Sequence, residues 1–263
     1  MLKIDNLVKT YGRFTAVDNI SLNVAPGEIF GFLGPNGAGK TTTIKMLAGL
    51  LLPDSGQITI NDNLLSQQPL VCKSDTGYIP DRPWLFEKLT GMEYLQFIAS
   101  LYNLAEKTFQ ANSAHYLELF DLTDWQHHLI ESYSHGMRQK LIMTSVLMLD
   151  QPLLIIDEPM VGLDPKSARI VKELFKQKAA SGTTIFLSTH SLEIAEELCN
   201  RIAIITNGQL HIIGTMETLR QKAGKEDSDL EEIFLELTGA WEMQSVIQAL
   251  QDPSIHTGQG NKR

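Results

Sequence analysis

The sequence predicts an α/β fold built on a mixed or parallel sheet. Apolar runs at 29–33 and 153–156, and the stretch 183–187 with Ile185, Phe186 and Leu187 after two threonines, are typical of strands buried on both faces. A stretch with helical character follows each of them. From about residue 82 to 150, helical periodicity replaces the alternation typical of exposed strands. This change predicts an α-helical subdomain inserted into the sheet-forming part of the chain.

Length and composition indicate a globular chain with a sizeable core. The 263 residues are 43% apolar and 20% charged, which allows one large domain or two small ones. The net charge of −9 argues against general nucleic-acid binding, which depends on Lys and Arg to neutralise phosphates. No run approaches the roughly 18 apolar residues that cross a bilayer, and the N-terminus lacks the apolar segment of a signal peptide.

Cysteine usage points to a reducing compartment. Cys72 and Cys199 lack metal-binding or redox spacing, so each is expected to be a small packed residue. We therefore expect a cytoplasmic protein that is soluble in isolation and reaches a membrane only through a partner.

Residues 1–33 predict strands of an N-terminal antiparallel β-subdomain. Ile20, Leu22 and Val24 alternate with polar residues before a turn. Tyr11, just after the first strand, could stack on a nucleobase or could be a half-buried strand residue. Taken alone, the residue favours the second interpretation.

A glycine-rich loop follows the strand 29–33 and precedes a helical stretch, which is the context of a phosphate-binding loop. Its glycines let the backbone turn tightly and bring amides to phosphate oxygens at a helix N-terminus, where the dipole favours negative charge. Lys40 can bridge the β- and γ-phosphates, and the Thr41 hydroxyl can ligate magnesium. The loop predicts a P-loop NTPase core that holds nucleotide through Gly34, Pro35, Asn36, Gly37, Ala38, Gly39, Lys40, Thr41 and Thr42.

Two capping signals mark helices in the inserted region. Thr90 and Glu93 fit the capping box. Ser134 is expected to cap a helix that runs to about residue 149, and another helix is expected over 111–120.

The aromatic residues of this region are more often core than docking surface. Trp84, Phe86 and Trp125 are therefore expected to pack inside. A docking role stays open for Trp84 and Phe86, because they lie in a proline-containing connecting loop.

Polar residues at the ends of two buried strands are candidates for chemistry. Asp157 and Glu158 follow the run 153–156, at the edge where open α/β sheets bind ligands. Behind a phosphate-binding loop, Asp157 is expected to hold magnesium and Glu158 to polarise an attacking water. His190 ends the next strand, where it could sense the γ-phosphate or simply cap the strand. Asp164, shortly after the acids, could cross a dimer interface.

The end of the chain predicts short helices. Leu230, Ile233, Phe234 and Leu237 form one helical stripe, and a second amphipathic piece carries Val246, Ile247 and Leu250. We expect a C-terminal helical extension over 216–256 and disorder over 257–263, where apolar residues are lacking.

Together these motifs resemble the ATP-binding subunit of ABC transporters, in the family's order, from about residue 2 to 215. The resemblance implies an ABC-type ATP-binding domain over 1–215 that binds and hydrolyses ATP with Mg²⁺, and it favours adenine stacking for Tyr11. The matching motifs are the aromatic A-loop at Tyr11, Walker A at Gly34–Thr41, Walker B with the catalytic glutamate at 153–158, the D-loop at 162–164 and the switch histidine at His190.

Two positions depart from the family pattern. Residues 133–137 read Tyr-Ser-His-Gly-Met where the family usually has LSGGQ. Ser134 and Gly136 keep the hydroxyl and the close backbone approach that the resemblance assigns to the partner subunit's γ-phosphate, whereas His135 could narrow or retune that interface. Asp81 replaces the Q-loop glutamine. Its carboxylate can meet magnesium or water but cannot donate a hydrogen bond when ionised.

These departures and the tail at 230–239 are similar to the ATPases of type-2 ABC exporters, which pair with separate six-helix membrane subunits. The resemblance therefore implies a transmembrane permease partner, a second nucleotide-binding subunit in a homodimer, and a place at the cytoplasmic face of the membrane. It implies no nucleic-acid partner and does not choose the cargo.

Two other functions stay open at this stage. A non-transport ABC ATPase acting in translation or on DNA is disfavoured, because the chain has one nucleotide domain and only about 110 residues without sustained heptads between the Walker motifs. A regulatory module without turnover is disfavoured by the intact Lys40, Asp157, Glu158 and His190. Import instead of export is a further alternative.

Overall fold

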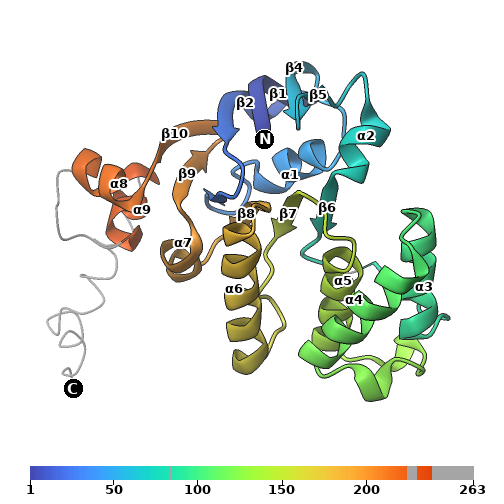
Figure 1. The fold of residues 1–263 in the computed structure, drawn as a ribbon. Coiled ribbons are helices and arrows are strands. Elements are labelled where there is room, and N and C mark those ends of the chain that lie inside the picture. Colours follow the sequence, from blue (N-terminus) through green and yellow to red (C-terminus); the bar gives the residue numbers. More distant parts are fainter. Residues whose placement is uncertain (83, 224–229, 239–263) are drawn as a thin grey trace, which may run out of the picture.

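The computed structural model describes residues 1–82, 84–223 and 230–238, which form two sheets with helices around them (Figure 1). The smaller sheet is antiparallel, as the sequence predicts, with strand order β2-β1-β4-β5. Its strands are β1 (Leu2–Tyr11), β2 (Phe14–Val24), β4 (Ser55–Ile60) and β5 (Asn63–Leu64).

The larger sheet has the order β10-β9-β3-β8-β7-β6 and is parallel except for β10. Every residue of β3, β7 and β8 is buried, which explains the apolar stretch that each of them contains. Its strands are β3 (Ile29–Leu33), β6 (Thr76–Ile79), β7 (Leu153–Asp157), β8 (Thr184–Thr189), β9 (Arg201–Thr206) and β10 (Gln209–Gly214).

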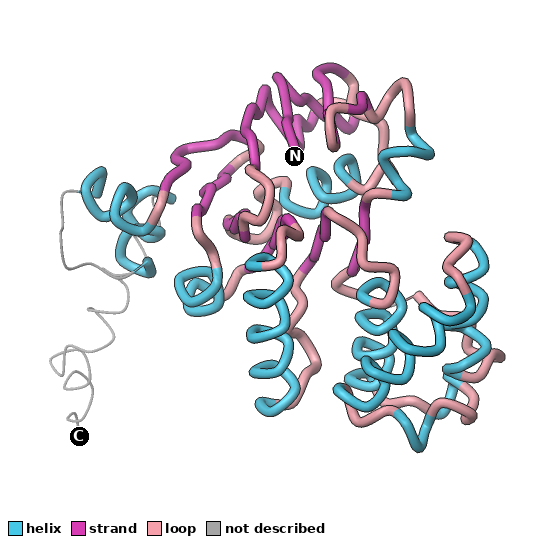
Figure 2. The backbone as a smooth tube through the Cα atoms, in the orientation of Figure 1, coloured by secondary structure: helices cyan, strands magenta, loops and turns pink. Residues whose placement is uncertain are grey.

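The helix α1 (Lys40–Leu47) lies between the two sheets (Figure 2). Its Ile44 and Met46 are buried in one apolar cluster with Phe30 and Phe186 of the larger sheet and with strand residues of the smaller one. This packing fixes the first turn of α1, and with it the loop that precedes the helix, against both sheets.

A helical subdomain occupies the chain between β6 and β7 and projects to one side of the sheets (Figure 1). The capping box predicted at Thr90 is present, with the Glu93 carboxylate accepting from the Thr90 N–H at 2.8 Å. The helices are α3 (Gly91–Leu101), α4 (Glu106–Leu119) and α5 (His135–Leu147), with 3-10 turns at Thr123–Trp125 and Ile130–Ser132.

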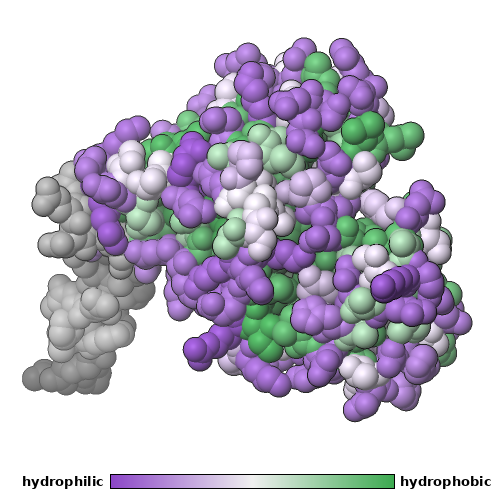
Figure 3. Space-filling view, in the orientation of Figure 1, coloured by the Kyte–Doolittle hydropathy of each residue, from purple (hydrophilic) through white to green (hydrophobic). Residues whose placement is uncertain are grey.

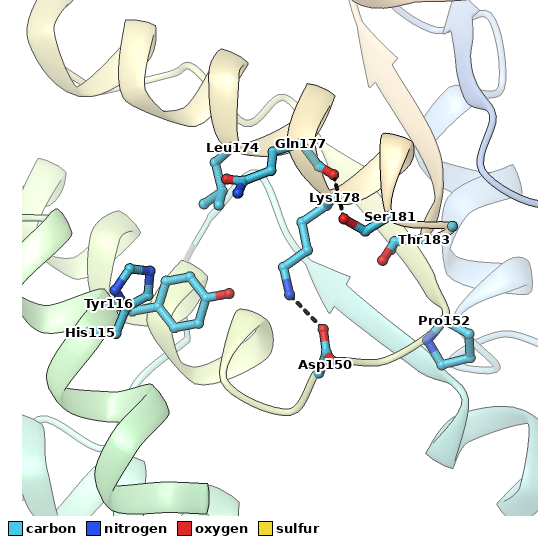
Figure 4. A pocket seen from close by; sticks show the side chains of 10 residues that line it. His115, Tyr116, Asp150, Pro152, Leu174, Gln177, Lys178, Ser181 and Thr183 are labelled. Carbon is cyan, nitrogen blue, oxygen red and sulfur yellow. Dashed lines mark hydrogen bonds and ion pairs between the residues drawn. The ribbon is translucent and has the colours of Figure 1, made fainter.

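Ion pairs join this subdomain to α6 (Pro165–Ala180) on its outer side. Lys178 of α6 pairs with Asp150 at 2.5 Å and lies 5.8 Å from the ring centroid of Tyr116, above a cavity of about 500 Å³ (Figure 4). Lys166 pairs with Asp121 at 2.8 Å near the other end of α6. Between them, apolar side chains that include Leu119 and Ile170 form a patch on the surface between α6 and the helical subdomain (Figure 3).

The elements that follow β10 pack against β9 and β10 of the larger sheet. Leu230 and Ile233 are buried there with Leu219, as the helical stripe predicts. The side chain of Leu237, the predicted helix around Val246, and the residues 257–263 lie outside the described part. The remaining helices are α2 (Pro69–Ser74), α7 (Leu192–Leu198), α8 (Met216–Ala223) and α9 (Leu230–Thr238).

Three sequence predictions need correction. The helix predicted over 111–120 begins earlier, at Glu106, where no side chain caps it and hence no capping signal exists. The short helix α2 was not predicted, although Pro69 at its first position is a start signal. Trp84, Phe86 and Trp125 are 89%, 57% and 40% exposed, so the prediction that they pack in the core was wrong.

Candidate active site

The candidate site lies where three neighbouring parallel strands end. In the register, Leu33 of β3 is opposite Thr189 of β8, and Asp157 of β7 is opposite Ser188 of β8. The glycine loop, the acidic pair and His190 therefore meet at one edge of the larger sheet, where α/β proteins of this kind bind ligands.

The glycine loop is closely packed against its surroundings. A Cβ on Gly34 would overlap the carbonyl oxygen of Ile205, and one on Gly39 would overlap that of Ala16. Gly39 also has φ +105, a conformation that other residues rarely adopt. Only glycine fits at these two points, and the loop that results delivers backbone amides to the N-terminus of α1, a site suited to phosphate.

Lys40 follows this loop and is 8% exposed. Its ammonium donates to the carbonyl oxygens of Gly34 at 2.6 Å and Pro35 at 3.1 Å. Burial lowers the pKa of Lys40, while the charges of Glu158 and Asp157 act in the opposite direction. The side chain is thus held across the loop, with its charge close to both acids.

Asp157 is 4% exposed and accepts a hydrogen bond from the Ser188 hydroxyl at 2.7 Å. Burial raises its pKa, and the neighbouring charges of Glu158 and Asp81 add to this effect, whereas Ser188 and Lys40 oppose it. A buried carboxylate whose charge is disfavoured gains from a nearby cation.

The groups around Asp157 fit magnesium. Thr41, at the second position of α1, is exposed and supplies a hydroxyl, while Asp157 supplies a carboxylate. Mg²⁺ prefers such oxygen ligands and binds through one or two carboxylates together with substrate phosphates and waters. The described residues contain no cluster of three or more His, Cys, Asp or Glu that could hold a metal ion.

Glu158 and His190 are in direct contact. Glu158 Oε1 lies 2.7 Å from His190 Nδ1, and Oε2 accepts from the Thr189 hydroxyl at 3.2 Å. Glu158 has φ +51, and its backbone N–H donates to the carbonyl of Ser188 at 3.0 Å. The carboxylate is therefore oriented by β8 from two sides, an arrangement suited to holding a general base in place.

Tyr11 and Asp81 occupy the margins of the site. Tyr11 is 51% exposed at the end of β1, with Lys9 Nζ 5.9 Å from its ring centroid, so its ring is available for stacking. Asp81 is half-buried beyond β6, close enough for its charge to raise the pKa of Asp157, and burial together with these two charges raises the pKa of Tyr78 to about 12.

The residues predicted to act on a partner form a separate group. Ser134 caps α5 by accepting from the Met137 N–H at 3.3 Å, as predicted. Asp164 caps α6 through Ser167 and pairs with Lys140 of α5 at 3.4 Å; these partners lower the pKa of Asp164. Among the described hydrogen bonds and ion pairs, none joins Ser134, His135, Gly136 or Asp164 to Lys40, Asp157 or Glu158.

Sequence reasoning assigned no role to Ser188 and Thr189, which orient the two acids. The sequence does contain a signal for them, because two hydroxyl residues follow the apolar stretch Ile185 to Leu187 and precede His190. Gly162, whose neighbour is His135, was identified only as part of a motif.

The chain is similar to known proteins in sequence and in fold. A family model described as ABC transporter matches residues 17–161. The linearmycin resistance ATP-binding protein LnrL of Bacillus subtilis is 39% identical over 224 residues, which cover 85% of this chain and 72% of that protein. The ABC-type transporter ATP-binding protein EcsA of the same organism is 34% identical, with 90% and 96% covered. A solved structure of an ATP-binding subunit of an ABC transporter matches with a TM-score of 0.87 at 34% identity, covering 90% of this chain and 99% of that one.

Proposed function

The chain belongs to the ABC transporter family, and on that premise we propose that it is the ATP-hydrolysing subunit of an exporter with a separate membrane-spanning subunit. The observation that carries this proposal is the oriented Glu158–His190 pair at 2.7 Å beside the loop that holds Lys40. A regulatory module would need the loop alone, whereas hydrolysis needs a group that orients water next to it.

We assign nucleotide binding to the glycine loop and Tyr11. The loop amides and Lys40 would hold the phosphates, and the exposed ring of Tyr11 would stack on adenine. Thr41 and Asp157 would hold Mg²⁺, which neutralises phosphate charge when it is bound, and Asp81 lies close enough to contribute through water.

Hydrolysis is assigned to Glu158 and His190. Glu158 would accept a proton from the attacking water, while Thr189 and His190 hold its carboxylate in orientation. His190 has 65% of its side chain exposed, so its ring can also reach toward the γ-phosphate from the end of β8.

A second subunit is expected to complete each site. The exposed N-terminus of α5, with Ser134 and Gly136, would contact the γ-phosphate bound by the partner, in a head-to-tail homodimer. Because the γ-phosphate would then touch both subunits, ATP favours the closed dimer and hydrolysis removes that preference.

The membrane partner is expected to dock between the helical subdomain and the larger sheet. A cavity of about 270 Å³ opens there between α3, α5 and β6, with Leu50 and Tyr102 exposed at its lining. Trp84 and Phe86, from the loop after β6, are also exposed, and the Phe86 ring packs edge-on against Phe97 of α3 at 5.6 Å. Exposed aromatic residues beside a hollow are typical of protein interfaces. Among the described residues, no helix is long and apolar enough to cross a membrane.

The names of the relatives support export instead of import. LnrL is named for resistance to linearmycin, and its sequence aligns over 85% of this chain. We therefore favour export over import and place the subunit at the cytoplasmic face of the membrane, without a nucleic-acid partner.

The test is Glu158→Gln, which keeps the size and the hydrogen-bonding capacity of the side chain but removes its basicity. We expect ATP turnover to fall by about 100-fold or more, with ATP binding retained and a closed dimer accumulating in ATP and Mg²⁺. Glu193→Gln on α7, an exposed glutamate of the same chain, is the matched control and should hydrolyse ATP at the wild-type rate. Turnover of Glu158→Gln within about threefold of wild type would refute the catalytic assignment.

The same variant identifies the partner. Tagged Glu158→Gln protein, recovered with ATP from detergent-solubilised membranes of the source cell, should carry with it a protein with about six predicted spans, as in type-2 exporters. Recovery of only ribosomes or another soluble ATPase would contradict the transport assignment while leaving the ATP site intact.

A further inference from the structure

The edge of β1 changes its neighbour close to Tyr11. Up to Val8, β1 is paired with β4, and the Asp54 N–H donates to the Val8 carbonyl at 2.9 Å. Because β4 begins only at Ser55, the carboxylate of Asp54 takes the place of a strand beyond this point. One of its oxygens accepts from the Thr10 N–H and from the Thr10 hydroxyl, both at 2.7 Å. The final residues of β1 are therefore held on this side by a side chain.

The other carboxylate oxygen of Asp54 holds Lys9. It accepts from Lys9 Nζ at 2.7 Å, and the Lys9 side chain is only 14% exposed. Lys9 Nζ also lies over the ring of Tyr11, 5.9 Å from its centroid, and an ammonium at this distance is attracted to the face of an aromatic ring. The same ammonium thus pairs with Asp54 and lies against one face of Tyr11, which leaves the opposite face of this exposed ring for a nucleobase.

The bonds to Asp54 keep its carboxylate charged. The bond from Lys9 contributes most, followed by the two bonds from Thr10, and together they lower the pKa of Asp54 to about 2. At neutral pH the carboxylate is therefore ionised, and an ionised carboxylate has enough acceptor sites for all three bonds at once.

Asp54 also stands at the end of a short connection from α1. The amides of Leu50 and Leu51 both donate to the carbonyl of Lys45, at 2.8 and 3.1 Å, so the chain turns tightly where α1 ends. Asp54 follows shortly afterwards. Since α1 begins at the glycine loop, Asp54 connects the element that would hold the phosphates to the strand end that would hold the base.

From these contacts, and resting on the proposed function, we infer that Asp54 is a positioning residue for the nucleobase of ATP. It fixes the end of β1 through Thr10 and the ring of Tyr11 through Lys9, at a set distance from the glycine loop. A ring that is already oriented loses less conformational freedom when adenine stacks on it. None of the described bonds of Asp54 reaches the glycine loop or the acidic pair, so Asp54 governs the affinity for ATP and not the rate of hydrolysis.

The experiment compares the binding of ATP with that of inorganic tripolyphosphate, which carries the phosphates without a base, to the full chain in Mg²⁺ by calorimetric titration. For Asp54→Ala we expect the Kd for ATP to rise about three- to tenfold, the range of one aromatic stacking contact, and the Kd for tripolyphosphate to stay at its wild-type value. ATPase assays should show the same rise in KM with kcat unchanged. Asp5→Ala, which removes an ion pair with Lys3 at 2.8 Å on the same strand, is the matched control and should leave both Kd values unchanged.

Two further variants show whether Asp54 acts through Lys9 and Tyr11. Lys9→Met keeps the stem of the side chain without its ammonium, and it should raise the Kd for ATP but not that for tripolyphosphate. Asp54→Ala should weaken ATP binding no further in a chain that already carries Tyr11→Ala. An unchanged Kd of Asp54→Ala for ATP, an equal rise for tripolyphosphate, or a full additional loss beside Tyr11→Ala would overturn the inference. A wild-type chain that binds neither ligand would instead contradict the proposed nucleotide site.

Discussion

The strand edge, which carries Lys40, Asp157, Glu158 and His190, and the helix-end face, which carries Ser134, His135, Gly162 and Asp164, are built in different ways. At the strand edge the side chains are held by a buried sheet: Asp157 by Ser188 at 2.7 Å, and Glu158 by Thr189 and His190. On the helix-end face the residues are exposed or half-buried and are held by helix caps and by contacts between two loops.

The contrast between the two regions indicates where amino-acid substitutions are tolerated. A substitution at the strand edge meets close-packed strands and charged neighbours, so the chemistry there admits few alternatives. The helix-end face admits His135 where a glycine is usual in the family, because the ring finds space over Gly162.

The largest effect is expected for Lys40→Ala at the strand edge. Its ammonium is the cation nearest to the loop carbonyls, and loss of one such preorganised donor typically costs about 100-fold or more in turnover. ATPase assays and nucleotide titration measure this loss. Lys45→Ala, an exposed lysine on the same helix, should retain activity. If Lys40→Ala kept more than about a tenth of wild-type turnover, the strand edge would tolerate substitution more than the contrast between the two regions allows.

An intermediate effect is expected for Ser188→Ala, which removes the hydrogen bond that favours the Asp157 carboxylate. The pKa of Asp157, already raised by burial, should rise further, because the Ser188 hydroxyl bonds to the charged form of the carboxylate and favours it. Magnesium needs the carboxylate, so the acid limb of the pH–rate profile should move to higher pH. Ser145→Ala, another buried serine, is the control and should leave that limb in place.

The raised pKa of Asp157 also determines how the stability of the fold changes with pH. With its native pKa above the unfolded one, Asp157 binds more protons in the folded state between those two values, so stability falls as pH rises through that window. Ser188→Ala widens the window, and thermal unfolding at a series of pH values should show a larger loss of Tm toward neutral pH. An unchanged pH profile would mean that Ser188 does not tune Asp157.

The success of the sequence predictions also differs between the two regions. The runs at 29–33 and 153–156, and the loop between Gly34 and Thr41, have strong local patterns, and the structure places them as predicted strands, loop and helix start. What the sequence could not supply are contacts between distant segments. Nothing local indicates that His135 meets Gly162, or that Trp84 stays exposed, because each depends on how the helical subdomain packs.

The smallest effect is expected at the helix-end face, for Asp164. The Asp164 carboxylate accepts from the Ser167 N–H at 2.9 Å and pairs with Lys140, and these interactions lower its pKa. Its contribution to stability is therefore present above the unfolded pKa and is lost as pH falls through the folded pKa. Asp164→Ala removes both the helix cap and the ion pair, whereas Asp164→Asn keeps an acceptor for the cap and removes only the charge.

Thermal unfolding at neutral pH should therefore place Asp164→Asn between wild type and Asp164→Ala, with a total decrease in Tm of a few degrees. The ion pair with Lys140 is largely solvated on the Asp164 side, so it contributes little to stability. Most of the decrease in Tm should therefore come from the loss of the helix cap, and the Tm of Asp164→Asn should lie closer to that of wild type. If Asp164→Asn were as destabilised as Asp164→Ala, the charge would hold the D-loop to α5 more strongly than the cap holds α6. The helix-end face would then share the electrostatic dependence of the strand edge, and the contrast between the two regions would fail at this residue.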